Sequence, residues 1–419
     1  VAYMALAMIL TLSGCGGQKD MLSGMAETEG GQTGTENVQT VTEEGQGRIR
    51  EDVIVVMGPS SEPEAGFDPA YGWGAGEHVH EPLIQSTLTV TTTDLKIDYD
   101  LATEMKVSDD GMTWTVTIRD GVFFTDGEEL TAEDVAFTYN TLKNTSSVND
   151  FTMLERAEAV DLHTVVFHMN RPYSIWPYTM AIVGIVPEHG YGENYGQNPI
   201  GSGRYRMKQW DRGQQVILEA NPDYYGEAPK MKKVTILFME EDAAYAAIRS
   251  GQADLAYTAA SYADSVIPGY ELLAFETVDN RGFNLPAVWS GETTGEGVAL
   301  GNDFTGDKAV RRAINLAIDR QVMIEHVLNG YGRPAYSVCD KMPWYNEAAE
   351  IQTDIPEAIR LLNESGWKPG ADGIVEKNGV RGAFSLMYPA GDSVRQALAA
   401  ETANQLKQVG IEVKIQGVS

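Results

Sequence analysis

The sequence predicts an α/β protein of two lobes, with an additional α+β part in the first lobe. Three observations support this fold class. A strand, an Ala-rich helix and a second strand follow one another at residues 234–239, 242–250 and 253–257, which is a βαβ unit and implies a parallel sheet. Residues 113–219 instead show pairs of strands with few helices, as in α+β folds. From residue 281 onward helices and strands alternate again, which predicts a second α/β lobe.

The first ordered segment is the apolar run at residues 52–58, which Gly58 and Pro59 close. Its continuous apolar character predicts a strand buried on both faces. Residues 113–119 alternate strictly between polar and apolar side chains, which predicts a half-buried antiparallel strand with Trp114 on its apolar face. Three Asp-Gly pairs near this strand predict tight turns, at residues 110–111, 120–121 and 126–127.

Thr131 opens the first predicted helix, which runs to Leu142. Asp134 follows Thr131 by three residues, which is the spacing of a capping box. Two further runs of β-branched and aromatic residues predict strands at 164–169 and 215–219.

The strongest helical pattern of the chain covers residues 307–328, where apolar side chains recur at helical spacing and Gly330 follows. We expect one continuous helix here. The remaining predicted elements are a helix capped by Asp354 and ending at Gly366, a strand at 384–388, a helix at 392–409 and a strand at 411–415.

Residues 12–15 (LSGC) follow an apolar run and have the form of a lipobox. We expect residues 1–15 to be a lipoprotein signal peptide and the Cys15 thiol to carry the lipid anchor. The run is far shorter than the ~20 apolar residues that a membrane-spanning helix needs. Residues 16–50 are rich in Gly, Thr, Glu and Gln and have few large apolar side chains, which predicts a flexible stalk.

The chain has 419 residues and carries 60 acidic against 31 basic side chains, a net charge of −29. This charge repels nucleic acid phosphates and anionic lipid headgroups, so the sequence excludes nucleic-acid binding. Only two cysteines occur. If Cys15 is acylated, Cys339 has no intramolecular disulfide partner, and we interpret it as a half-buried structural thiol.

The sequence lacks the motifs of common catalytic sites, including G-x-S-x-G, H-E-x-x-H and the phosphate-binding P-loop. Among six histidines only His78 and His80 lie close together, and two such ligands do not make a metal site. We therefore expect no enzyme, no cofactor and no metal, although a spatial pair of carboxylates remains open. The Gly-rich loop after the first strand is a poor place to bury aromatic rings, which favours Tyr71 and Trp73 as ligand contacts.

Eight short motifs follow one another between residues 81 and 320. They are residues 81–83 (EPL), 107–114 (VSDDGMTW), 119–127 (RDGVFFTDG), 130–135 (LTAEDV), 199–205 (PIGSGRY), 221–225 (NPDYY), 248–254 (IRSGQAD) and 310–320 (VRRAINLAIDR). As a set they resemble the peptide- and nickel-binding lipoproteins of ABC importers, of the oligopeptide- and dipeptide-binding type. The resemblance extends over essentially all of the chain from residue 52.

The resemblance implies a periplasmic-binding-protein-like fold of type II, in which two lobes close on a ligand by a hinge motion. Residues 51–280 would form the first lobe with its extra subdomain, and residues 281–419 the second. Residues 281–284 (RGFN) would lie near the first crossing between the lobes. Family members continue with more of the second lobe and a return crossing, so we expect the second lobe of this chain to be incomplete.

The resemblance also implies a function without bond chemistry. Such a protein captures a short peptide outside the cytoplasm and delivers it to ABC permease subunits in the membrane. We expect a monomer that the lipid at Cys15 holds at the cell membrane. The expected ligand-binding residues are Glu62, Phe67, Tyr71, Trp73 and Gly74 in the first lobe and Trp289 and Tyr388 in the second.

Three alternatives remain. Nickel-binding relatives are recognised partly by Arg and Trp side chains in the first lobe, near the segment that here reads SSVNDF at residues 146–151. Those side chains are missing from this segment, so a nickel chelate is the second choice of ligand. The same fold also serves peptide receptors that signal to a sensor. A surface-anchored hydrolase is the third alternative.

Overall fold

The computed structural model describes residues 50–71, 83–146, 149–275, 280–338, 340, 342 and 344–418. Several features predicted above lie outside these ranges: the signal peptide with Cys15, almost all of the stalk, Trp73, Gly74, His78, His80 and Cys339. Within the described ranges, every helix is too short or too polar to cross a membrane.

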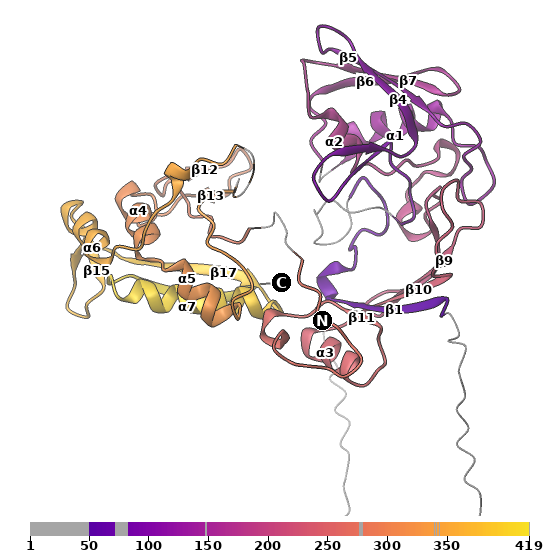
Figure 1. Ribbon diagram of the computed structural model, residues 1–419. Coiled ribbons are helices and arrows are strands. Elements are labelled where there is room, and N and C mark those ends of the chain that lie inside the picture. The colour runs from indigo at the N-terminus through magenta and orange to yellow at the C-terminus, as the bar shows by residue number, and fades with distance from the viewer. Residues whose placement is uncertain are drawn as a thin grey trace, which may run out of the picture. The chain divides into compact units, whose positions relative to one another are not determined.

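A five-stranded mixed sheet has the order β11-β1-β10-β9-β8 (Figure 1). Strand β1 (Asp52–Met57) runs parallel to β10 (Lys233–Phe238) on one side and to β11 (Leu255–Ala256) on the other. Helix α3 (Glu241–Arg249) connects β10 to β11, which confirms the predicted βαβ unit. Strands β9 and β8 continue the sheet in antiparallel pairing, at Gln215–Ala220 and Tyr205–Asp211.

Both faces of β1 pack against apolar side chains, as predicted. Val53 and Val55 contact one cluster of buried residues, and Ile54 and Val56 contact another, which includes the alanines of α3. Only Val56 is completely buried, so the prediction of a fully buried strand was wrong in degree. The side chains of Val53, Ile54 and Val55 are half-buried, because the clusters on the two faces cover them only in part.

A second, four-stranded antiparallel sheet has the order β4-β5-β7-β6. The strands are β4 (Ala102–Val107), β5 (Thr113–Ile118), β6 (Leu154–Asp161) and β7 (Thr164–Met169). Helix α1 (Ala132–Thr145) packs against this sheet (Figure 1). On β5 the apolar side chains of Trp114, Val116 and Ile118 are buried and alternate with half-exposed threonines, which confirms the predicted half-buried strand.

Helix α1 begins with the predicted capping box. The Thr131 side chain accepts a hydrogen bond from the Glu133 amide at 3.3 Å, and the Asp134 carboxylate accepts one from the Thr131 amide at 2.9 Å. These bonds satisfy backbone donors that have no partner within the helix. We call the described residues up to 280 the first region and those from 281 onward the second region. The first region also contains β2 (Thr89–Thr91), β3 (Ile97–Tyr99), α2 (Trp176–Met180) and short 3₁₀ turns at Pro59–Ser61, Glu188–Gly190, Tyr195–Gln197 and Ala260–Tyr262.

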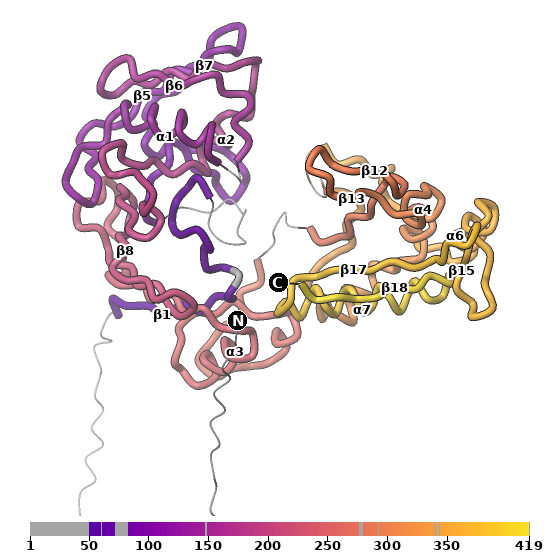
Figure 2. The backbone as a smooth tube through the Cα atoms, turned by 180° about the vertical axis from the view of Figure 1, so that it is seen from behind, coloured from indigo at the N-terminus to yellow at the C-terminus, as the bar shows by residue number. Residues whose placement is uncertain are grey.

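In the second region, two parallel strands form a βαβ unit with the helix between them. Strands β17 (Ala383–Pro389) and β18 (Glu412–Val418) pair in parallel, and α7 (Ser393–Lys407) runs along them (Figure 2). The other elements are α4 (Lys308–Ala317), α5 (Arg320–Val327), α6 (Ile355–Glu364), a 3₁₀ turn (Glu347–Ala349) and the short strands β12 (Glu292–Thr293), β13 (Ala299–Leu300), β14 (Lys368–Pro369), β15 (Val375–Lys377) and β16 (Val380–Arg381).

The prediction of one helix over residues 307–328 was wrong. Helix α4 ends at Ala317, and Ile318 and Asp319 adopt extended backbone angles before α5 begins. Asp319 caps α5, because its carboxylate accepts a hydrogen bond from the Val322 amide at 3.1 Å. The apolar periodicity continues through the break, so the pattern by itself did not reveal it.

The large apolar cores fall on either side of the predicted boundary at 280/281. Three clusters draw their members from residues 53–270, and one draws its members from residues 285–413. Each set of elements therefore has a core of its own, while the boundary itself stays a prediction.

Candidate ligand-binding site

The loop after β1 carries five of the expected site residues, and the structure describes three of them, Glu62, Phe67 and Tyr71. At its start, the Glu62 carboxylate is committed to contacts within the protein. It accepts the Trp210 indole N–H at 2.8 Å and the Gly213 amide at 2.8 Å and 3.0 Å. Glu62 thus holds the turn between β8 and β9, and its predicted role toward a ligand remains untested.

Phe67 lies in the core. Its ring is 3% exposed and meets the Trp210 ring edge-on, with centroids 5.2 Å apart. The Phe67 amide donates to the Gly196 carbonyl at 2.8 Å, where the loop passes close to another backbone segment. Gly66 makes this approach possible, because a Cβ on Gly66 would lie 2.5 Å from the same carbonyl oxygen.

Asp68 follows Phe67 and is also buried. Its carboxylate accepts hydrogen bonds from the Ala70 amide at 2.9 Å and from the Tyr191 hydroxyl at 3.1 Å. Burial raises the pKa of Asp68, and the two hydrogen bonds oppose this effect. Sequence reasoning did not single out Asp68, although an acidic residue between Phe and Pro in a turn is a typical place for such an anchor.

Tyr71 marks the point where the loop turns outward. Its side chain is 49% exposed, in contrast to Phe67 and Asp68. The buried part of the loop therefore fixes the position of Tyr71, and the ring has free surface for a ligand. Trp73 and Gly74 follow two and three residues later, outside the described residues.

In the second region, Trp289 and Tyr388 are placed differently from each other. Trp289 is 51% exposed and precedes the β12–β13 hairpin. Tyr388 lies on β17 and is half-buried. Its neighbour across the strand pair is Gly417, and a Cβ there would lie 3.4 Å from the tyrosine ring, so the ring covers this glycine.

The segment that joins the two regions has little regular structure in its described part. Between β11 and α4 it contains one 3₁₀ turn and the two-residue strands β12 and β13. Several large apolar side chains are exposed here, including Phe275, Phe283 and Trp289. Phe275 and Phe283 were not among the expected site residues, although Phe283 belongs to the RGFN segment expected near the first crossing between the lobes. A segment with few buried contacts is suited to movement.

Comparison with known proteins gives a consistent picture. The profile of the family described as "Bacterial extracellular solute-binding proteins, family 5 Middle" matches residues 96–419. Protein XP55 of Streptomyces lividans is 37% identical over 382 residues, which cover 87% of this chain and 67% of that protein. The oligopeptide-binding protein AppA of Bacillus subtilis (strain 168) is 29% identical over 408 residues, covering 92% of this chain and 72% of AppA.

Two solved structures are similar to this chain over most of its length. The structure of AppA from Bacillus subtilis in complex with a nonapeptide has a TM-score of 0.73 and 28% identity, and the match covers 89% of this chain and 76% of AppA. NikZ from Campylobacter jejuni in complex with Ni(L-His) has a TM-score of 0.76 and 24% identity, covering 88% of this chain and 74% of NikZ. The likeness to NikZ shows the fold alone.

Proposed function

We propose, from the premise that the chain belongs to the bacterial extracellular solute-binding proteins of family 5, that it captures short peptides outside the cytoplasm and delivers them to an ABC importer. The predicted fold class, a type II periplasmic-binding-protein fold, is confirmed by the solved structures of its relatives. Family membership also confirms the resemblance that the eight sequence motifs indicated.

One observation supports a peptide as the ligand most strongly. The oligopeptide-binding AppA is 29% identical over 92% of this chain, and its solved structure holds a nonapeptide. The exposed rings of Tyr71 and Trp289 add to this support, since aromatic surfaces pack against peptide side chains of many kinds.

The proposed mechanism needs no bond chemistry. A peptide that contacts both lobes only in their closed arrangement shifts the equilibrium toward closure by its difference in affinity for the two states. The poorly packed segment between β11 and α4 is the proposed place of the hinge. The closed form would be the one that permease subunits recognise, and no residue is proposed to act as a catalyst.

A thermal-shift titration of the full chain tests this proposal. The ligands are synthetic peptides of two to nine residues and, separately, nickel with L-histidine. Peptide at a hundredfold excess over Kd should stabilise the folded state by about 2.7 kcal/mol. Stabilisation by nickel–histidine without stabilisation by any peptide would overturn the choice of ligand, and peptide recovered in cleaved form would favour the hydrolase.

Substitutions of the exposed rings locate the site. We expect Tyr71→Ala and Trp289→Ala to weaken peptide binding by about 0.5–1.5 kcal/mol each. Tyr99→Ala and Trp344→Ala are matched controls, because these rings are also exposed, at 45% and 68%, and belong to no expected site. Equal losses in all four variants would contradict the assignment.

The lipid anchor is a separate part of the proposal. It rests on the LSGC sequence at residues 12–15 and on the extracellular character of the family. Labelling of growing cells with an alkyne fatty acid should mark the protein, and Cys15→Ser should abolish the label and release the protein from the membrane.

A separate experiment distinguishes an importer subunit from a receptor. If cells that lack the protein still take up labelled peptide, the role of a receptor is favoured over that of an importer subunit.

A further inference from the structure

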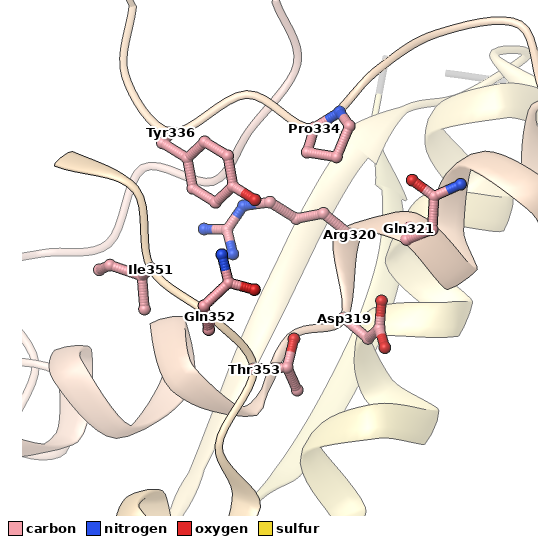
Figure 3. Close-up of a pocket in the computed structure, with 8 residues that line it drawn as sticks. All are labelled: Asp319, Arg320, Gln321, Pro334, Tyr336, Ile351, Gln352 and Thr353. Carbon is pink, nitrogen blue, oxygen red and sulfur yellow. The ribbon is translucent and has the colours of Figure 1, made fainter. Parts of the chain in front are cut away.

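A small cavity of about 260 Å³ lies within the second region (Figure 3). The start of α5 forms one wall, and two loops form the others. The lining residues are Asp319, Arg320, Gln321, Pro334, Tyr336, Ile351, Gln352 and Thr353. All of them fall between residues 319 and 353, so the cavity does not depend on the ligand site proposed above.

Arg320 is the only cation among the lining residues. Its Nε donates a hydrogen bond to the Ala335 carbonyl at 3.0 Å, and its Nη2 donates to the Asn315 side-chain oxygen. The guanidinium carbon lies 4.9 Å from the centroid of the Tyr336 ring. These contacts fix the plane of the guanidinium group, while Nη1 donates to no residue in the described part of the chain.

The charge of Arg320 has no carboxylate partner within the described ranges. Burial lowers the pKa of Arg320, and among its neighbours Tyr336 opposes this effect. Asp319 lines the same cavity, but its carboxylate caps α5 and points away from the guanidinium group (Figure 3). A half-buried cation without a counterion is costly, because burial removes part of its hydration.

A second polar side chain, that of Gln352, lies beside the guanidinium group of Arg320. Figure 3 shows the Gln352 side chain on the side toward which the guanidinium group points. Gln352 is exposed, and its amide makes no hydrogen bond within the described residues. An amide and a guanidinium group together can present several N–H donors to one small acceptor.

We propose that this cavity is a binding site for a small carboxylate anion, held by Nη1 of Arg320 with the Gln352 amide as a second donor. A carboxylate supplies the missing negative charge and matches the planar fork of an arginine. The volume of about 260 Å³ lies below that of pockets for larger ligands, which favours an anion of the size of acetate or a single amino acid.

Saturation-transfer NMR on the acetate methyl group tests this site in the full chain. Sodium acetate is titrated at constant ionic strength, with chloride as the balancing anion. We expect transfer to acetate, and Arg320→Gln should weaken binding roughly tenfold or more, since hydrogen bonds to charged groups contribute about 1.5–3 kcal/mol. A protein that shows no transfer at tens of millimolar acetate would overturn the proposal.

A second variant covers the case in which Arg320→Gln does not fold. Gln352→Glu places a carboxylate beside the guanidinium group and should abolish acetate binding while the fold is kept, because the native side chain is exposed. Arg249→Gln is the matched control, since Arg249 also lies over a tyrosine ring, at 5.7 Å from Tyr245, but on α3. Acetate binding that survives Gln352→Glu, or that Arg249→Gln removes equally, would refute the site, and binding of phosphate without acetate would refute the carboxylate class.

Discussion

Asp319 and Gln405 are joined by hydrogen bonds in both directions, although 86 residues separate them. The Asp319 amide donates to the Gln405 side-chain oxygen at 2.7 Å, and the Gln405 side-chain nitrogen donates to the Asp319 carbonyl at 3.3 Å. Gln405 is 4% exposed and belongs to α7. The two bonds replace helical hydrogen bonds at the break between α4 and α5, so the break depends on a distant side chain.

Gln405→Ala should destabilise the protein by about 1–3 kcal/mol, because the Asp319 amide and carbonyl lose their partners. Urea unfolding followed by circular dichroism measures the change. Gln396→Ala is the control, since Gln396 lies exposed on the same helix. Equal effects of the two substitutions would show that helix propensity, and not the contact with Asp319, is responsible.

Glu62→Ala should lower the free energy of unfolding by roughly 1–3 kcal/mol, since the Trp210 indole and the Gly213 amide lose their acceptor. Glu62→Gln, which keeps one oxygen, should cost less. Glu64→Ala is the control, because Glu64 is exposed in the same loop. If Glu62→Ala weakens peptide binding and leaves stability unchanged, Glu62 acts on the ligand and our structural assignment is wrong.

Tyr139→Phe should leave the stability unchanged or increase it. The Tyr139 side chain is completely buried, and its hydroxyl has no hydrogen-bond partner in the described part of the chain. Removal of an unsatisfied buried group relieves a desolvation cost of about 1–3 kcal/mol. Thermal unfolding of the variant tests this, and a clear loss of stability would mean that the hydroxyl has a partner, such as a buried water.

Tyr195→Phe should have the opposite effect on stability, because the hydroxyl of Tyr195 has hydrogen-bond partners. Its hydroxyl donates to the Ile200 carbonyl at 2.7 Å and accepts from the Gln85 side chain at 3.2 Å. We expect a loss of about 1–3 kcal/mol, because the Ile200 carbonyl loses this donor and one N–H of the Gln85 amide loses its acceptor. The two Tyr→Phe substitutions remove the same atom, so opposite signs in one unfolding assay isolate the effect of hydrogen bonding.

His189 should make stability depend on pH. Its Nε2 lies 2.8 Å from Asp126, and this hydrogen bond is the main cause that raises the His189 pKa above its ordinary value of 6.5. Protonation is therefore more favourable in the folded state. The resulting stabilisation is complete below about pH 6.5 and is lost as the pH rises through the raised pKa.

The measurement compares the native protein with His189→Gln in urea. The difference in stability should be larger at about pH 5.5 than at about pH 8.5. It should be modest, because the His189 side chain is 43% exposed and solvent screens the pair. A difference that does not change with pH would exclude the interaction with Asp126 as its source.

Local patterns predicted most of the secondary structure. The capping box at Thr131 was visible because all of its parts lie within four residues, and the alternation along β5 showed which face is buried. The same reasoning failed at Ile318 and Asp319, where the helical pattern continues and Gln405 stabilises the break. Local patterns were also insufficient for the loop after β1, because residues close together in this loop are buried in one case and exposed in the other.

In that loop the sequence alone gave Phe67 and Tyr71 the same expected role. The structure buries the Phe67 ring against Trp210 and leaves Tyr71 half-exposed. A sequence pattern cannot separate these outcomes, because burial in a turn depends on which distant segment packs against it. The 195–197 turn and the Trp210 ring make that choice here.

The order of motifs along the chain was sufficient to identify the family, and with it the fold class and the general function, because each motif is a short run of residues that can be recognised in the sequence alone. The surroundings of Arg320, which hold no carboxylate partner among the described residues, the break before α5 and the internal role of Glu62 were decided only by tertiary structure. The break and the role of Glu62 arise from contacts between residues far apart in sequence, and such contacts leave no periodic signal in the chain.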